Sequence, residues 1–323
     1  MIKKLTLLFA LTTSAFSVDY IDLYLNKGID PIEKSLDRGL TNKKYWQEKL
    51  KSQDTTFGYF QNLTSLLVCD KQKGSLKIYK KSKNANSKFK LLKKHDAFTG
   101  QKDGDKIEEG DLKTPVGVYR LRKRLDKVDS FYGPLAFVTS YPNVYDKIRG
   151  KTGHGIWIHG LPFNQERDEY TKGCIAIGND NIECMDRNID IKTSLLLIDD
   201  SVNIKVNKES LASILSGVFA WRYAWLYNDI DTYLSFYHSK FSRFDGVRKV
   251  PFSAYKKRVF AKKESKRIIF KNIAIVPYPG EKKGLFMITF DESYITKTYI
   301  FNGEKTLIAK LDKNNNFRIL AEQ

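Results

Sequence analysis

A histidine and a cysteine fifteen residues apart constrain the fold of this chain more than any other feature. His159 ends a short apolar run at residues 156–158, a pattern that favours a strand and places the histidine at the edge of a sheet. Cys174 follows Gly173, and a glycine at this place lets the backbone turn tightly and expose the sulfur. The fold is therefore expected to bring a strand end and a glycine turn together.

The two side chains have the chemistry of a cysteine nucleophile and its base. A thiol with a pKa of about 8.5 is mostly protonated at neutral pH, so an imidazole must remove its proton or stabilise the thiolate. The carbonyl of Gly160 could orient the second ring nitrogen, and the amides of Gly173 and Cys174 would face an oxyanion. Acyl transfer is the reaction class indicated. The alternative is that both residues only pack in the core.

Two further segments extend this pattern. Residues 110–117 read Gly-Asp-x-x-Thr-Pro-x-Gly, a turn that leads into a strand, and Ile-His-Gly and Lys-Gly-Cys follow at 158–160 and 172–174. In this order the three segments resemble the L,D-transpeptidase (YkuD-type) catalytic domain, over about residues 61–200.

The resemblance implies a role for each matching position. Cys174 corresponds to the nucleophile, His159 to the general base and Gly160 to the residue whose carbonyl orients that base. Gly173 corresponds to the oxyanion-hole turn, and Lys172 stands where the family has a basic or polar residue. Members of the family attack the bond after the L-centre of the third stem residue of peptidoglycan. They pass the acyl group to an amine, which makes a crosslink, or to water, which trims the stem.

One position departs from the family pattern. Many members have an arginine two residues after the cysteine, where this chain has Ala176, so Lys172 or Arg167 is expected to anchor a substrate carboxylate instead. The sequence Lys-Gly-Cys-Ile-Ala is more similar to the cell-shape L,D-carboxypeptidases of helical Gram-negative bacteria.

The remaining histidines and cysteines are secondary candidates. His154 lies between two glycines in a turn that could contact substrate, but His159 is preferred as the base because a strand fixes it. Cys69 and Cys184 fall in apolar patterns and are expected to pack, although a disulfide between them is left open. No metal-ligand spacing occurs, and no cofactor is expected.

The first 17 residues are expected to be a cleavable signal peptide, with Lys3 and Lys4 before a short apolar core and a small-x-small site at residues 15–17. This predicts a periplasmic protein. The formal net charge of +19 favours anionic surroundings such as the carboxylates of peptidoglycan stems, or else only solvates the surface. Nucleic-acid binding is not expected, because no recognition motif accompanies the charge.

Composition and periodicity divide the mature chain into three parts. Residues 18–61 are expected to form a helical segment that braces the catalytic domain or joins a second subunit as a homodimer. Residues 62–201 are expected to form the mostly-β YkuD-type catalytic domain. Its predicted strands lie at 66–69, 76–80, 89–93, 117–122, 135–140, 156–159 and 194–198, with a helix at 181–188.

The last part, residues 205–323, begins with two predicted helices at 209–227 and 230–237. Strands follow at 268–276, 285–291, 294–301, 306–311 and 317–320, with a hairpin turn at Asn302-Gly303. Helices before a meander of strands resemble the NTF2-like α+β cone. Trp225, Tyr233 and Tyr237 are expected either to line a small-ligand site in it or to form its core.

The leading expectation is a periplasmic L,D-carboxypeptidase that removes the terminal D-alanine from tetrapeptide stems and so influences cell shape. One alternative is an L,D-transpeptidase that forms crosslinks or attaches proteins to the wall. The other is a non-catalytic wall-binding scaffold.

Overall fold

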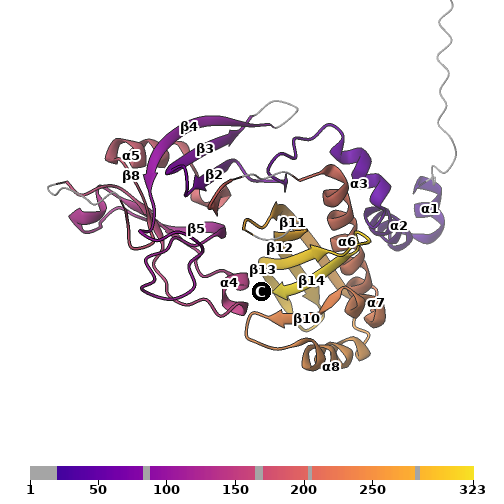
Figure 1. Ribbon diagram of the computed structural model, residues 1–323. Coiled ribbons are helices and arrows are strands. Elements are labelled where there is room, and N and C mark those ends of the chain that lie inside the picture. The colour runs from indigo at the N-terminus through magenta and orange to yellow at the C-terminus, as the bar shows by residue number, and fades with distance from the viewer. Residues whose placement is uncertain (1–19, 83–87, 164–169, 203–205, 281–283) are drawn as a thin grey trace, which may run out of the picture.

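The computed structural model describes residues 20–82, 88–163, 170–202, 206–280 and 284–323 (Figure 1). A β-barrel and a six-stranded sheet lie side by side, and three N-terminal helices lie beyond the long helix of the second unit. The expected signal peptide at residues 1–17 lies outside the described residues. Among the described residues, no helix combines the length and apolar character needed to cross a membrane.

The N-terminal segment forms α1 (Tyr20–Lys27), α2 (Asp30–Leu40) and α3 (Lys43–Leu50). Asn42 caps α3 by accepting the amide hydrogen of Lys44 at 2.9 Å. Trp46 is buried and stacks on Phe219 of the C-terminal unit, with ring centroids 5.3 Å apart. The apolar side of these helices packs on the C-terminal helix α6 (Lys208–Leu226). The expected contact with the catalytic region is made instead by the end of the segment, where Phe57 packs on Tyr79 with ring centroids 4.8 Å apart and Asp54 accepts the Phe89 amide hydrogen at 3.1 Å.

The predicted catalytic region closes into a barrel. Around it the strands are ordered β2-β3-β4-β8-β7-β6-β5-β9, and β9 pairs in parallel with β2. Alternating apolar side chains of these strands fill the interior. The strands are β2 (Ser65–Asp70), β3 (Ser75–Lys81), β4 (Phe89–Phe98), β5 (Gly117–Leu125), β6 (Ala136–Thr139), β7 (Trp157–His159), β8 (Ile175–Ile177) and β9 (Ser194–Asp199).

Short helices connect these strands. α4 (Val144–Ile148) begins at the capping box of Asn143, and α5 (Asn179–Asn188) covers the helix predicted at 181–188. Two 3-10 turns complete the region, η1 (Ser130–Tyr132) and η2 (Ile191–Thr193).

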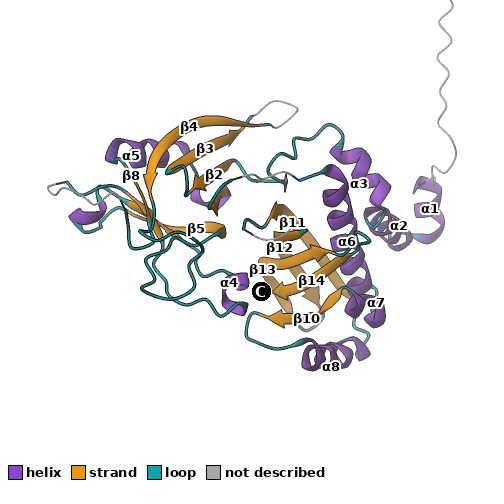
Figure 2. Ribbon diagram, in the orientation of Figure 1, coloured by secondary structure: helices purple, strands orange, loops and turns teal. Residues whose placement is uncertain are grey.

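The C-terminal unit has the expected helices-then-strands order. Figure 2 shows α6 and α7 (Ile230–Ser235) along one side of its sheet, which is ordered β1-β11-β12-β13-β14-β10. Trp225, Tyr233 and Tyr237 are at most 7% exposed and belong to the aromatic core, which favours the packing interpretation over the ligand-lining one. The strands are β1 (Tyr59–Phe60), β10 (Tyr237–Arg243), β11 (Lys266–Pro277), β12 (Leu285–Thr296), β13 (Ile300–Leu311) and β14 (Phe317–Glu322).

One local prediction in this unit was wrong, and two elements were not predicted. The Asn302-Gly303 pair lies inside β13, opposite Ser293 and Glu292 of β12, and the chain turns at residues 297–299 instead. The long pairing of two 12-residue strands outweighs the turn preference of the dipeptide. Sequence patterning also missed β10 and α8 (Lys249–Ala261), because the 237–261 stretch is rich in charge and has weak periodicity.

A hydrophobic cluster joins the barrel to the C-terminal sheet. It contains Val68 and Leu197 from the barrel strands together with Val276, Met287 and Ile308 from the sheet. All five are at most 4% exposed. The two units therefore share buried apolar surface.

Candidate active site

The site is built where β7 and β8 lie next to each other in parallel. His159 pairs with Ala176, so Cys174, two residues earlier, lies opposite Trp157. The Trp157 amide donates to the Cys174 Sγ at 3.5 Å, and the thiol contacts the Gly155 carbonyl at 3.5 Å. Residues that oppose each other, or are two apart on one strand, share a face of a sheet. The imidazole and the sulfur are therefore on the same face of neighbouring strands.

His159 is held in one orientation. Its Nδ1 lies 2.7 Å from the Gly160 carbonyl oxygen, and its ring meets Tyr132 edge-on with the centroids 5.0 Å apart. Because a carbonyl only accepts, Nδ1 carries the proton, and in the neutral ring Nε2 is the basic nitrogen. The side chain is 1% exposed. This is the tautomer that a general base needs.

The position of the Gly160 segment depends on Asn179, a residue that the sequence pattern did not indicate. The Asn179 Oδ1, at the start of α5, accepts the Leu161 amide hydrogen at 2.7 Å. A Cβ added to Gly160 would lie 2.9 Å from Pro134 Cδ, which is too close for a side chain. Asn179 thus fixes the segment whose carbonyl orients His159. Nothing in the sequence pattern singles out this asparagine among the other polar residues of its helix.

The turn before Cys174 explains the Thr-Pro-x-Gly segment. Thr114 is fully buried, and its hydroxyl donates to the Gly173 carbonyl at 3.0 Å while accepting the Gly100 amide hydrogen at 2.8 Å. Gly173 has φ +131°, and a Cβ there would lie 2.8 Å from the Lys113 carbonyl oxygen, so only glycine fits. The segment holds the cysteine turn in place.

The amide of Gly173 is already engaged. It donates to Thr171 Oγ1 at 2.9 Å, and the same hydroxyl donates to the Cys174 carbonyl at 2.7 Å. In this structure Gly173 therefore acts through its backbone conformation. To donate to an oxyanion, the Gly173 amide would first have to break its hydrogen bond to Thr171 Oγ1.

Asp111 organises the loop beside this turn. Its carboxylate accepts hydrogen bonds from Lys106 Nζ at 2.8 Å and from the amides of Ile107, Glu108 and Lys113 at 2.7, 3.1 and 3.1 Å. Burial opposes the charge, but these four donors outweigh it and hold the pKa of Asp111 well below its usual range. The loop therefore contains an aspartate that is ionised at neutral pH.

Segment 151–155, which contacts the thiol, is tied down by buried charges. Lys151 is 5% exposed, and its Nζ lies 2.7 Å from a carboxylate oxygen of Asp105 and 2.9 Å from one of Asp146. The Thr152 amide donates to the Ile107 carbonyl at 2.9 Å. This network fixes the wall of the site that carries the Gly155 carbonyl.

The other predicted site residues lie differently. His154 is an exposed side chain whose Nδ1 is 4.0 Å from a carboxylate oxygen of Glu109. Lys172 is exposed next to the cysteine turn. Arg167 lies outside the described residues. Ala176 is fully buried in β8, so its place in this chain is packed rather than open to substrate.

The other two cysteines do not share this environment. Cys69 and Cys184 are free thiols, so the disulfide left open by the sequence does not form. Complete burial raises the pKa of Cys69 to about 12, which keeps it protonated and unreactive. Within the described residues, no group of three or more potential metal-ligating side chains comes together.

Comparisons with known families agree with both units. A model of the L,D-transpeptidase catalytic domain, YkuD, matches residues 64–204, and a model of the Cds6 C-terminal NTF2-like domain matches residues 213–323. The expected fold class, a mostly-β catalytic domain followed by an α+β NTF2-like domain, is confirmed.

Solved structures extend the match to most of the chain. The helical cell shape determining protein Pgp2 of Campylobacter jejuni is 38% identical, with a TM-score of 0.79 over 88% of this chain and 99% of its own. A mutant of the same Campylobacter protein gives 37% and 0.81 over the same shares. Bd1075 of Bdellovibrio bacteriovorus is 27% identical, with a TM-score of 0.63 over 81% of this chain and 92% of its own.

Among curated sequences, a putative L,D-transpeptidase of Escherichia coli K12, YafK, is 35% identical over 80 residues, which are 25% of this chain. The match spans 29% of the length of that relative.

Proposed function

We propose that this chain is a peptidoglycan L,D-carboxypeptidase. The proposal proceeds from the fact that the chain belongs to the family of the cell-shape protein Pgp2 and carries a YkuD-type catalytic domain. The chain would remove the terminal D-alanine from tetrapeptide stems. The observation that carries this proposal is the shared face of His159 and Cys174, with Nδ1 of the imidazole committed to the Gly160 carbonyl.

In the first half of the reaction, Nε2 of His159 takes the thiol proton of Cys174, and the thiolate attacks the carbonyl carbon before D-alanine. A C–S bond forms, the C–N bond breaks, and the imidazolium gives its proton to the leaving amine. In the second half, His159 takes a proton from water, the hydroxide attacks the thioester, and the C–S bond breaks. A C–O bond replaces the C–S bond, and the imidazolium returns its proton to the departing thiolate. The products are a tripeptide, D-alanine and the restored thiol.

The segments around the pair have supporting roles in this proposal. Thr114 and Gly173 present the cysteine, and Asn179 holds the Gly160 segment. The Gly173 amide would donate a hydrogen bond to the oxyanion once it has given up its hydrogen bond to Thr171 Oγ1. Lys172 or Arg167 is proposed to anchor the substrate carboxylate, because a basic group would attract it, and His154 is proposed as a further substrate contact.

The test is muropeptide analysis after purified protein is incubated with defined tetrapeptide stems. Wild type should yield tripeptide, whereas Cys174→Ala should yield none. Cys184→Ala is the matched control, because Cys184 is also a partly exposed free thiol, and its activity should equal that of wild type. If Cys174→Ala still trims stems, the mechanism is wrong.

The same assay separates the alternatives. Crosslinked dimers that depend on Cys174 would identify the chain as an L,D-transpeptidase, because an amine would then replace water as the acyl acceptor. Retention on cell-wall sacculi without any Cys174-dependent product would favour the wall-binding scaffold.

We also propose a periplasmic location, with residues 1–17 as a cleaved signal peptide, since the substrate lies in the cell wall. Cell fractionation and N-terminal sequencing of the mature protein test this. A start at Met1 in the cytoplasmic fraction would contradict it.

Residues 18–61 are proposed to contribute a homodimer contact. Exposed apolar side chains of α1 and α2 support it, including Ile21, Leu25 and Leu36, which are 72%, 75% and 54% exposed. Light scattering of the purified chain and of Leu25→Lys would test this contact. A monomeric wild type would refute it.

A further inference from the structure

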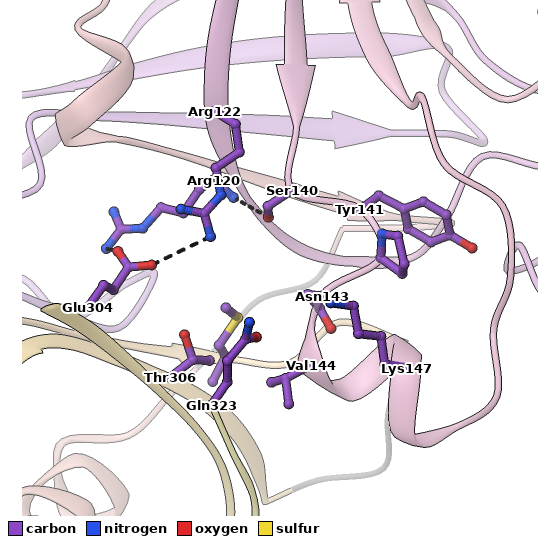
Figure 3. A pocket seen from close by; sticks show the side chains of 12 residues that line it. Arg120, Arg122, Ser140, Tyr141, Asn143, Val144, Lys147, Glu304, Thr306 and Gln323 are labelled. Atoms are coloured by element: carbon purple, nitrogen blue, oxygen red, sulfur yellow. Dashed lines mark hydrogen bonds and ion pairs between the residues drawn. The ribbon is translucent and has the colours of Figure 1, made fainter. Parts of the chain in front are cut away.

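A cavity lies between the barrel and the C-terminal sheet. Its volume is about 290 Å³, and its walls come from β5, from residues 140–147 including α4, and from β12 and β13 with the end of the chain (Figure 3). Neither His159 nor Cys174 lines it. This volume is at the lower limit of small-molecule sites in proteins, so it suits an amino acid or a dipeptide.

The cavity has more positive than negative side chains. Among the side chains that line it, Arg120, Arg122 and Lys147 are cationic and Glu304 is anionic. Figure 3 shows Glu304 beside the two arginines and Lys147 on another side of the cavity. Ser140 and Thr306 add hydroxyl groups to the lining. An anion would therefore be attracted, while one acidic group remains to receive a cation.

The ion pairs inside the cavity are loose. The Nη2 atoms of Arg120 and Arg122 lie 3.3 and 3.7 Å from the carboxylate oxygens of Glu304. Charge-assisted hydrogen bonds have distances of about 2.7–2.9 Å. Arg124, two residues further along β5, meets this standard with a bidentate pair to Asp186 at 2.6 and 2.8 Å. The cavity arginines thus keep donors that Glu304 does not satisfy.

Arg120 is the more firmly fixed of the two. Its Nη2 donates to Thr289 Oγ1 at 2.9 Å, which connects the barrel to the C-terminal sheet. Arg122 is more open, with 58% of its side chain exposed. A ligand can therefore reach Arg122 without disturbing the contact that Arg120 makes across the two units.

An amino acid matches this charge pattern because its ammonium and carboxylate are attached to the same carbon. It therefore needs a cationic and an anionic partner side by side, which Arg122 and Glu304 provide. A phosphate would satisfy the arginines but would be repelled by Glu304, and a simple amine would be repelled by the three cations.

We propose that this interdomain cavity binds a free α-amino acid, with the carboxylate on Arg122 and Arg120 and the ammonium on Glu304. The choice of D-alanine as this amino acid depends on the proposed function, which releases it, whereas the site itself does not. Such a ligand would touch both units and would favour the arrangement in which they are packed together.

The experiment titrates D-alanine into the full chain, without any peptidoglycan, and follows backbone and arginine side-chain NMR signals. Wild type should show saturable shifts at Arg122. Arg122→Ala should weaken binding at least tenfold, a loss of about 1.4 kcal/mol. Glu304→Gln should weaken D-alanine binding in the same way but leave acetate binding intact, because acetate has no ammonium. Lys123→Ala is the matched control, since this exposed neighbour on β5 does not line the cavity.

The proposal is overturned if wild type shows no saturable shift up to about 50 mM D-alanine, a concentration well above the dissociation constant of even a weak site. It is also overturned if Arg122→Ala binds as well as wild type, or if a tetrapeptide stem binds there and D-alanine does not. Because the titration involves no turnover, a chain that binds D-alanine but trims no stems would refute the proposed function alone. A chain that trims stems but binds no D-alanine would refute only this site.

Discussion

Asn179 illustrates how one side chain can position a proposed catalytic group, His159, without touching it. Its Oδ1 holds the Leu161 amide, and the preceding carbonyl, that of Gly160, orients His159. We expect Asn179→Ala to lower kcat about tenfold with little change in KM, because the imidazole would lose its alignment while substrate contacts remain.

Steady-state kinetics on tetrapeptide stems would measure this effect. Asn179→Asp, which keeps an acceptor oxygen, should recover most of the activity. Asn188→Ala is the control at the other end of α5, where the asparagine side chain donates to the Cys184 carbonyl at 2.8 Å, far from His159 in the chain. Equal losses in both alanine variants would mean that Asn179 only stabilises the helix.

Lys256 shows a different effect at the residue scale. Burial of its ammonium, which lies 5.1 Å from the Trp225 ring centroid and 5.3 Å from that of Phe252, lowers its pKa to about 8. An unfolded lysine titrates near 10.4, so between pH 8 and 10.4 the unfolded chain binds more protons and stability rises with pH. Below pH 8 the folded protein bears the full cost, about 3 kcal/mol.

We therefore expect Lys256→Met to be more stable than wild type at pH 7, with the difference shrinking as the pH rises from 8 to 10.4. Urea unfolding at several pH values would measure it. The exposed neighbour Lys257, changed to Met, should follow wild type throughout. A constant difference across this range would show that the ammonium is not the cause.

At the scale of elements, the loop at residues 106–113 depends on one carboxylate. We expect Asp111→Asn to cost about 2 kcal/mol of stability at pH 7, because an amide cannot replace a charged acceptor for three backbone amides and Lys106. The folded pKa of Asp111 is depressed, so its contribution is present above about pH 4 and is lost as the pH falls below that value.

Denaturant unfolding of wild type and Asp111→Asn at pH 7 and at decreasing pH tests this. The two curves should approach each other below pH 4. Asp103→Asn is a suitable control, since this exposed aspartate precedes the same loop. A difference that persists at low pH would assign the effect to side-chain shape instead of charge.

At the scale of the whole molecule, the cluster between barrel and sheet decides whether the two units unfold together. Ile308 lies in that cluster, whereas Ile319 lies in the internal core of the C-terminal unit, and both are fully buried. Each Ile→Ala change should cost about 2–5 kcal/mol through lost burial and a cavity.

Only Ile308→Ala is expected to separate the calorimetric transition of the barrel from that of the sheet, because it removes apolar contact between the units. Ile319→Ala should lower the stability of the sheet and leave the barrel transition unchanged relative to wild type. Identical calorimetric profiles for the two variants would show that the cluster does not couple the units.

Sequence by itself determined most strands of the barrel, the C-terminal helices-then-strands pattern and the candidate pair of Cys174 and His159. These depend on periodicity and on backbone preferences that act within a few neighbouring residues. It failed at Asn302-Gly303, where a local turn preference met the pairing of two long strands.

Only the tertiary structure decided the positions of Asn179, Lys151 and the interdomain cavity. Each depends on contacts between residues far apart in the chain, such as the 169 positions between Arg120 and Thr289. Asparagine, lysine and arginine are usually exposed and solvated, so their pattern along a chain does not reveal which of them packing will bury and pair.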